Sequence, residues 1–163
     1  VVGELAAGKG LDGNTLCREM MMNWDEIRAL ASDPLVTIGA HTCRHLALSK
    51  LDADTARQEI ARSIERIEQE LGRPCRHFSY PYGCSRSAGE REFEMARELG
   101  MSTAVTTRKG QIDAAHAERL TQLPRFSLNG DFQDPRFIKV MLSGMPFRLW
   151  NAIGRFSGAN ASI

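Results

Sequence analysis

The sequence predicts an α/β fold in which helices cover a parallel β-sheet. Short apolar runs of strand length alternate along the chain with longer segments whose apolar residues recur every three or four positions. Such alternation is typical of βα units, and it is compatible with an open sheet as well as with a closed barrel. The chain has 163 residues, of which 42% are hydrophobic, and this suffices for one domain with a sizeable core.

The first expected elements are a helix and a strand. Residues 1–15 are rich in glycine and are expected to form a loop. A helix begins after Asn23, which can cap it while Glu26 returns the bond in a capping box. The Ser-Asp-Pro sequence at 32–34 ends this helix, and the residues 35–40 form a short buried strand.

The clearest helical pattern lies between Asp52 and Leu71. Its apolar residues are spaced by four, four, three and four positions, whereas Glu59 and the other charged residues are expected on a solvated face. The next elements are, in chain order, a strand, a helix and two strands, at 77–80, 87–100, 103–107 and 123–128. Ser87 is expected to open the helix, and Pro124 places the last strand at a sheet edge or a strand start.

The chain changes character after residue 134 and is expected to be helical there. One helix would be lined by apolar residues from Phe137 to Leu142, and a second would begin at Pro146. We therefore divide the chain into a (β/α) domain at 1–133 and a helical tail at 134–163. The tail is expected to pack on the domain, and docking onto a partner or a membrane surface is the alternative.

Composition and charge disfavour several classes of partner. The net charge is +1, so no basic excess indicates a nucleic acid or an anionic membrane as partner. No apolar run approaches the roughly 20 residues of a transmembrane helix. The four cysteines form no Cys-x-x-Cys pair and are expected to be free thiols. The compartment stays open, with the cytoplasm favoured over the periplasm or secretion.

Two histidines are the central candidates for chemistry. His41 and His45 lie four residues apart, directly after the expected strand at 35–40. On one helical turn such residues face the same way, and their ring nitrogens can share a zinc ion at about 2.0–2.1 Å. Cys43 lies between them and should point away from a metal held there. The alternative is a pair of polar loop histidines, but functional residues of parallel sheets collect at this end of a strand.

A second candidate is the segment 77–83, His-Phe-Ser-Tyr-Pro-Tyr-Gly. Pro81 fixes the backbone and Gly83 permits a tight turn, and such a turn can aim a backbone N–H into a site as an oxyanion donor. Tyr80 and Tyr82 supply rings that can stack on a sugar. Without the histidine pair, a strand that merely ends in a proline turn would explain the segment equally well.

Together the two segments resemble the motifs of the polysaccharide deacetylases, which are the carbohydrate esterase family 4 or NodB-homology proteins. Residues 38–45, Ile-Gly-Ala-His-Thr-Cys-Arg-His, resemble the family's His-Ser/Thr-x-x-His zinc motif. Residues 78–83, Phe-Ser-Tyr-Pro-Tyr-Gly, resemble the motif that forms one wall of its groove. The resemblance implies a distorted (β/α) barrel of the polysaccharide deacetylase type, with a metal at the carboxyl ends of the strands.

The resemblance also implies roles for individual residues. His41 and His45 would be metal ligands, and Thr42 would steady the loop between them. The backbone N–H of Tyr82 would stabilise an oxyanion together with the metal, while Pro81 and the Tyr82 ring would shape the groove wall. The expected cofactor is therefore a divalent metal, zinc before cobalt, iron or nickel.

Three departures from the family's pattern matter. The opening Thr-Phe-Asp-Asp motif, which holds the general base and the third metal ligand, is absent. The chain starts at Val1, so we expect that motif to precede it, and this portion of the barrel to be incomplete and inactive alone. Ser79 stands where many members have an arginine that holds the base, and Arg125 is expected to reach the same carboxylate. The late Leu-x-Leu-His motif is also absent, which leaves the general acid unassigned.

The expected function is metal-dependent hydrolysis of N-acetyl groups in polysaccharides or oligosaccharides that contain N-acetylglucosamine, with release of acetate. Two alternatives stay open. One is a non-catalytic carbohydrate-binding relative, which the missing aspartates support, and the other is an esterase that removes O-acetyl groups from xylan. The expected partner is an acetylated carbohydrate. Self-association through the tail or an exposed sheet edge, giving a homo-oligomer, is a further expectation.

Overall fold

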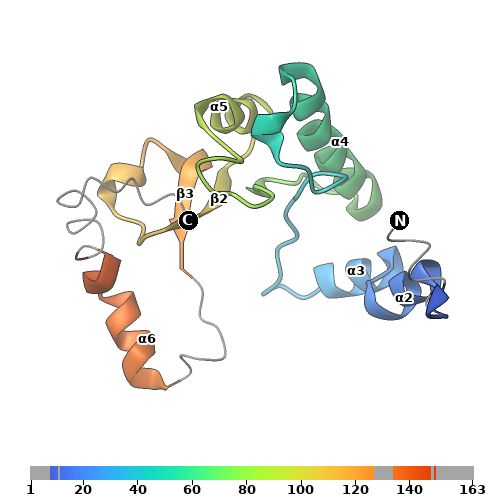
Figure 1. The fold of residues 1–163 in the computed structure, drawn as a ribbon, viewed down its shortest axis with the longest axis horizontal. Coiled ribbons are helices and arrows are strands. Elements are labelled where there is room, and N and C mark those ends of the chain that lie inside the picture. The colour runs from blue at the N-terminus through green and yellow to red at the C-terminus, as the bar shows by residue number, and fades with distance from the viewer. Residues whose placement is uncertain (1–7, 11, 127–133, 148, 150–163) are drawn as a thin grey trace.

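The computed structural model describes residues 8–10, 12–126, 134–147 and 149 (Figure 1). Its sheet has three parallel strands in the order β1-β2-β3, formed by His77–Ser79, Thr103–Lys109 and Leu123–Arg125. The register pairs Phe78 with Ala104 and Val105 with Leu123. The expected parallel sheet is therefore confirmed, and Pro124 lies in an edge strand, where its missing N–H costs least.

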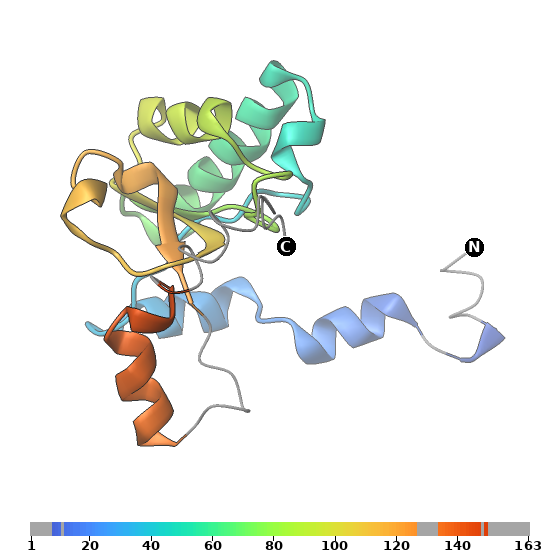
Figure 2. The ribbon, with the colours of Figure 1, turned by 60° about the vertical axis from the view of Figure 1, so that its left-hand side comes forward.

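Two helices cover one face of the sheet, as the views in Figures 1 and 2 show. They are α4 (Ala53–Leu71) and α5 (Glu90–Glu98). Ile60 of α4 and Phe93 of α5 are buried against Phe78 of β1 in one hydrophobic cluster. Each such side chain contributes about 1.5–3 kcal/mol to folding by leaving water. This cluster holds the strands in place, and so fixes the loops that follow them.

The expected boundaries of α4 are confirmed. The carboxylate of Asp52 accepts from the Thr55 N–H at 2.8 Å and caps the helix, and Gly72 ends it with a φ of 64°. Ser87, in contrast, does not open α5. Its hydroxyl donates to the Cys84 carbonyl at 3.1 Å, and the helix begins after Gly89, whose N–H donates to Glu92 at 2.7 Å.

The segment at 35–40 is not the buried strand that its composition predicts. Only Ala40 forms a ladder bridge, to Phe78, and the Leu35 side chain is 93% exposed. The cause lies in the preceding turn, in which the Asp33 carboxylate and carbonyl accept from the N–H groups of Leu35 and Val36 at 2.8 and 3.0 Å. These N–H groups are thus used in a turn and not in a ladder, although Gly39 already lies beside β1, where a Cβ on it would be 3.0 Å from the His77 carbonyl oxygen.

Two N-terminal helices precede this segment and extend away from the sheet (Figure 2). The first, α2 (Gly13–Met20), replaces part of the expected loop at 1–15, because Asp12 accepts from the backbone of its first turn. The second, α3 (Trp24–Ala31), has the expected capping box between Asn23 and Glu26. Arg28 joins α3 to α4 through Glu70 at 2.5 Å.

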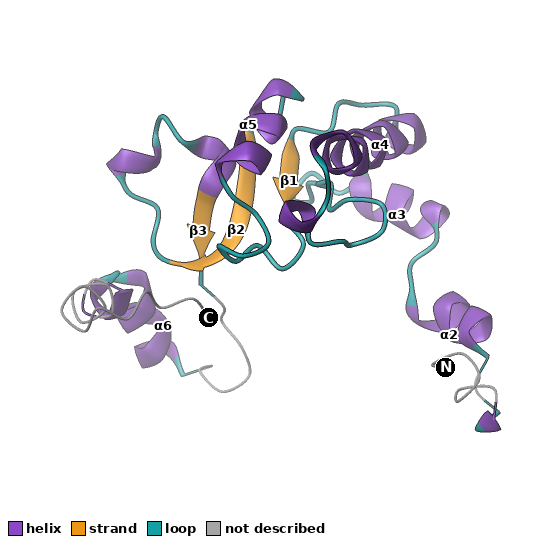
Figure 3. Ribbon diagram, turned by 45° about the horizontal axis from the view of Figure 1, so that its top comes forward, coloured by secondary structure: helices purple, strands orange, loops and turns teal. Residues whose placement is uncertain are grey.

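The remaining elements lie in the connections between these helices and strands or follow β3. Three short 3-10 helices are η1, η2 and η3, at Leu48–Lys50, Ala114–His116 and Leu120–Gln122. Figure 3 shows α6 (Pro135–Leu142) beyond the ends of β2 and β3. The rest of the second tail helix, from Trp150 on, and the end of the strand expected to reach 128 lie outside the described residues. The domain division at 133 stays a prediction. No helix in the described ranges is long and apolar enough to cross a membrane.

Candidate functional site

The two histidine-bearing and tyrosine-bearing segments meet at the carboxyl edge of the sheet. Ala40 accepts from the Ser79 N–H at 2.9 Å and donates to the His77 carbonyl at 2.8 Å, so that His41 emerges beside the end of β1. The ring centroids of His41 and His45 are 4.8 Å apart, and those of His45 and Tyr82 are 5.0 Å apart. The structure thus brings His41, His45 and Tyr82 into one cluster.

The histidine pair does not lie on the helical turn that its spacing predicts. Thr42 and His45 adopt left-handed backbone conformations, with φ of 64° and 54°, and Tyr82 has a φ of 61°. These three are the non-glycine residues of the described ranges with positive φ. Such a conformation costs about 1 kcal/mol or more for a residue with a Cβ, and it persists where the surroundings impose it. Backbone strain is therefore concentrated in this cluster.

Two side chains hold the loop 41–45, which carries both histidines, in this conformation. The Thr42 hydroxyl accepts from the His45 N–H at 3.1 Å. The Glu59 carboxylate accepts from the Arg44 backbone N–H at 3.0 Å and from its Nε–H at 2.7 Å. Because Glu59 belongs to the long helix α4, it ties the loop to the most regular part of the fold.

Glu59 is a correction to the sequence prediction, which placed it on a solvated face. It is only 5% exposed. Its position could have been found from spacing, because residues 56, 59, 60 and 63 share one helical face, and Ala56, Ile60 and Ser63 are all buried. A buried carboxylate at such a position needs partners, and Arg44 supplies them.

We expect Glu59→Ala to lower the free energy of unfolding by about 1–3 kcal/mol, because the Arg44 N–H loses its acceptor and α4 loses its link to the loop. Equilibrium urea denaturation measures this change. Glu65→Ala is the matched control on the same helix, since Glu65 is exposed and, among the residues that the structure describes, bonds only Gln69. We expect this variant to stay within about 0.5 kcal/mol of the parent. Equal effects of the two variants would contradict the proposed link.

The turn after β1 presents Tyr82 and is braced from β2. The Gly83 N–H donates to the Pro81 carbonyl at 2.7 Å, and the Thr107 N–H donates to the Gly83 carbonyl at 3.1 Å. The Thr107 hydroxyl donates to the Tyr82 carbonyl. The Tyr82 side chain is 58% exposed, and its backbone N–H has no acceptor within the described part of the chain. That N–H is available to a ligand.

The two residues that precede Tyr82, Tyr80 and Pro81, are both buried. The Pro81 side chain is fully buried, so its influence on a groove wall is exerted through the backbone. The expectation that Tyr80 stacks on a sugar is wrong, because it is only 1% exposed and its ring lies against Phe78 and Phe93. The Tyr80 hydroxyl donates to the Thr121 carbonyl at 2.7 Å, and burial raises its pKa above the ordinary value.

The other candidate residues lie apart from the cluster. Arg125 ends β3 on the same edge of the sheet and is exposed, and no bond within the described residues joins it to His41, His45 or Tyr82. His77 bonds the Thr103 hydroxyl at 2.8 Å. His116 bonds Asp113 at 2.8 Å in the connection between β2 and β3. The cluster therefore contains the expected metal ligands and the expected turn donor, but not the arginine expected to hold the base.

The donor set of the cluster fits part of a divalent metal site. The His41 Nδ1 lies 2.6 Å from the Ser79 carbonyl, and donation to it leaves Nε2 with a free lone pair, as in metal-ligating histidines. His45 adds a second imidazole. A catalytic zinc site usually has three protein ligands, and the described residues contain no group of three or more His, Cys, Asp or Glu placed to hold a metal. The residues present thus fit two positions of such a site.

Comparison with protein families gives a match over the same region. The family model described as polysaccharide deacetylase matches residues 11–104, a span that includes both motifs. No curated protein matches the chain.

Several solved structures share the fold. The deacetylase PplD of Streptococcus pyogenes, solved in complex with acetate, has a TM-score of 0.66 at 19% identity, over 77% of this chain and 54% of its own. The polysaccharide deacetylase BC0361 of Bacillus cereus has a TM-score of 0.63 at 19% identity, and the match covers 74% of this chain and 36% of BC0361. IcaB of Ammonifex degensii has a TM-score of 0.59 at 23% identity, and the match covers 74% of this chain and 52% of IcaB. The chain thus spans about half the length of these proteins or less, and the likeness confirms the expected α/β fold.

Proposed function

Because this chain belongs to the polysaccharide deacetylase family, we propose that it forms part of an enzyme that removes N-acetyl groups from polysaccharides or oligosaccharides containing N-acetylglucosamine. One observation carries the proposal. The segment that carries His41 and His45 and the turn that carries Tyr82 meet at the carboxyl edge of the sheet, inside the region that matches the family. This edge is where parallel-sheet enzymes place their reacting groups.

In this proposal, His41 and His45 hold a divalent metal, with zinc favoured by the two imidazoles. A bound metal of this kind polarises a carbonyl oxygen and makes a water molecule more acidic. The Ser79 carbonyl orients the His41 ring by accepting from Nδ1, and Glu59 orients the loop that carries His45. By the family's pattern, a third ligand and a general base would come from an Asp-Asp pair, which this sequence does not contain.

The Tyr82 turn contributes the second half of the chemistry. Attack of water on an acetamide carbonyl develops negative charge on its oxygen, and the Tyr82 N–H donates a hydrogen bond to that oxygen. A positioned donor of this type is worth about 3–4 kcal/mol in the transition state. The exposed Tyr82 ring forms a wall against which a sugar can lie. Arg125, at the end of β3, is proposed to orient the carboxylate of the base.

Two other functions compete with this proposal. A carbohydrate-binding relative without catalysis is supported by the absence of an Asp-Asp pair from the sequence and by the fact that the described residues hold no group of three metal ligands. An esterase acting on O-acetyl groups of xylan would use the same metal and the same oxyanion donor. All three share an acetylated carbohydrate as partner, so that only the reaction distinguishes them.

We expect the complete gene product, supplied with zinc, to release acetate from the tetramer of N-acetylglucosamine faster than from acetylated xylan. Acetate is measured in parallel reactions by an enzyme-coupled assay, with the His41→Ala variant as the control for contaminating hydrolases. Faster release from xylan would assign the esterase function. Binding of the tetramer without any acetate release would assign the non-catalytic function.

A further inference from the structure

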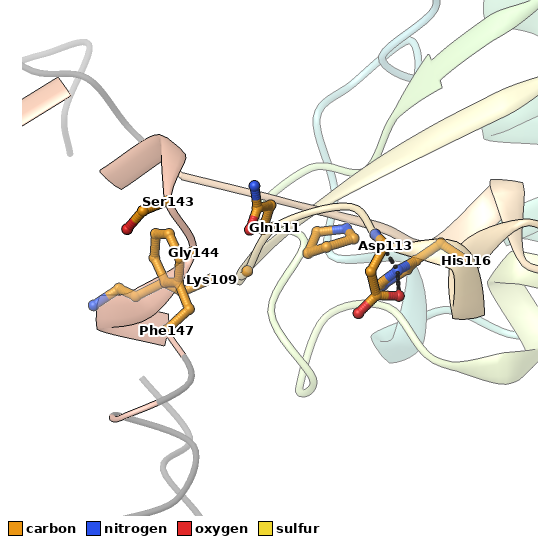
Figure 4. Close-up of a pocket in the computed structure, with 9 residues that line it drawn as sticks. Lys109, Gln111, Asp113, His116, Ser143, Gly144 and Phe147 are labelled. Atoms are coloured by element: carbon orange, nitrogen blue, oxygen red, sulfur yellow. Dashed lines mark hydrogen bonds and ion pairs between the residues drawn. The ribbon is translucent and has the colours of Figure 1, made fainter. Parts of the chain in front are cut away.

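The helix α6 is attached to the rest of the domain mainly at its last turn. Figures 1 and 3 show it apart from α4 and α5, beyond the ends of β2 and β3. No helix or strand that the structure describes makes an extended contact with it. The Gln111 Nε2 donates to the Leu142 carbonyl at 2.7 Å, and Figure 4 shows Gln111 close to Gly144, the second residue after the helix. The loop that follows β2 thus holds α6 by one end.

The side chains of α6 divide into an apolar side and a polar side. At 3.6 residues per turn, Arg136, Lys139 and Ser143 fall on one side of the helix. The other side carries five apolar residues, which are Phe137, Ile138, Val140, Met141 and Leu142. An amphipathic helix of a globular domain normally buries its apolar side, yet no residue of α6 is buried. The domain therefore leaves this side partly uncovered.

The exposed apolar surface continues past the end of the helix. Val140 and Leu142 of α6 are 44% and 55% exposed. Met145 and Leu149, which follow the helix, are 54% and 58% exposed. Single exposed apolar residues are common on protein surfaces, but a group of them within one short segment marks a surface that docks onto a protein or a membrane.

The charge of this segment favours one of these two kinds of partner. Residues 134–163 contain four basic residues and one acidic residue, Asp134, so that their net charge is +3. The whole chain has a net charge of +1, which leaves −2 on residues 1–133. The carboxylate of Asp134 is paired with Arg136 at 2.8 Å, and no acidic residue follows it in the sequence. The basic excess thus lies in the segment that exposes its apolar residues.

A membrane surface with anionic lipids matches both features. Helices with basic residues on the polar side and aliphatic or aromatic residues on the other lie in the plane of the interface. Each Lys or Arg near the headgroups strengthens binding, and Trp and Phe, which the segment contains, are typical of the headgroup level. A second copy of the chain is a poorer occupant, because two segments of charge +3 repel each other.

We propose that α6 and the residues after it bind the protein reversibly to the surface of a membrane that contains anionic lipids. The apolar side of α6 enters the lipid surface, and Lys139 contacts the headgroups. The loop after β2 then holds the domain close to that surface through Gln111. This proposal goes beyond the deacetylase function and does not depend on it, because it requires neither metal nor carbohydrate.

The test mixes the complete gene product with vesicles of phosphatidylcholine or of phosphatidylcholine and phosphatidylglycerol in equal parts, and measures the bound fraction by co-sedimentation. We expect binding to the mixed vesicles that weakens as salt is added, and little binding to phosphatidylcholine alone. Val140→Asp should lower the affinity at least about tenfold, because an apolar contact with lipid is lost. Lys139→Gln should lower it about fivefold, the effect of one basic residue near the surface.

Leu35→Asp and Lys50→Gln are the matched controls. Leu35 is 93% exposed after α3, and Lys50 is exposed at the end of η1, so both lie outside the proposed surface. Both variants should bind the mixed vesicles like the wild type. Circular dichroism checks the folding of every variant, and Lys139→Gln decides the test if Val140→Asp does not fold.

Several results would overturn the proposal. They are a wild type that binds neither kind of vesicle, a wild type that binds both kinds equally, and variants of α6 that bind like the controls. Sedimentation velocity on the same samples tests the other occupant. A dimer that Val140→Asp dissociates, in a protein that does not bind vesicles, would assign this surface to a second copy of the chain.

Discussion

Replacing His41 or His45 by alanine is expected to abolish zinc binding by the complete gene product. Loss of a residue that merely orients a metal ligand lowers metal affinity by about 10–100-fold, and loss of the ligand itself must cost more. Each variant should therefore bind zinc at least about 100-fold more weakly than the parent. Competition with a chromophoric chelator gives the affinities, and elemental analysis gives the metal content per chain.

His77→Gln is the matched control for these variants. His77 lies on the same sheet, but its Nδ1 is bonded to the Thr103 hydroxyl at 2.8 Å, and a glutamine can keep a bond there. We expect this variant to bind zinc like the parent. Undiminished zinc content in both His41→Ala and His45→Ala would show that the pair is structural, and would leave the carbohydrate-binding function as the better one.

Gly83→Ala is expected to disable the Tyr82 turn. A Cβ at this position would lie 2.6 Å from the Thr107 backbone nitrogen, and Gly83 has a φ of +60°. Both segments are backbone, so the turn must move away from β2 and take the Tyr82 N–H with it. Removal of one oxyanion donor lowers kcat by about 100–1,000-fold, and we expect acetate release to fall by this amount.

Gly72→Ala separates the close contact from backbone strain. Gly72 has nearly the same φ, +64°, but a Cβ there would meet no atom within 4 Å. Gly72→Ala should lower the free energy of unfolding by about 1 kcal/mol and leave acetate release intact. Urea denaturation and acetate release are measured for both variants. Equal loss of activity in both, or full activity in Gly83→Ala, would remove the turn from the mechanism.

Much of the fold follows from local patterns in the sequence. The helix α4 was predictable because its apolar residues keep one face over 19 residues and because Asp52 and Gly72 mark its ends. The strand expected at 35–40 could not be predicted correctly, because the Asp33 turn takes up the N–H groups of Leu35 and Val36 that a ladder would need. Nor was α2 predictable, because its Asp12 cap stands within a glycine-rich stretch that favours a loop.

The site was predictable in its parts but not in its support. The spacing of His41 and His45 indicated that they lie together, and their rings are 4.8 Å apart, although neither the expected strand before them nor the expected helical turn is formed. The left-handed loop that achieves this depends on Glu59, which is distant in sequence. The burial of Tyr80 could have been predicted, because Phe78 and Tyr80 are two residues apart and so point to the same side of a strand. Whether these residues act in catalysis stays a prediction.

The central claim is that the complete gene product hydrolyses N-acetyl groups with a metal held by His41 and His45. The most direct test is acetate release from the N-acetylglucosamine tetramer before chelation, after removal of metal by a chelator, and after zinc is restored. We predict release that stops on chelation and returns with zinc, and none in the His41→Ala variant at any stage. Release that continues undiminished without metal, or that is unaffected by His41→Ala, would contradict this account.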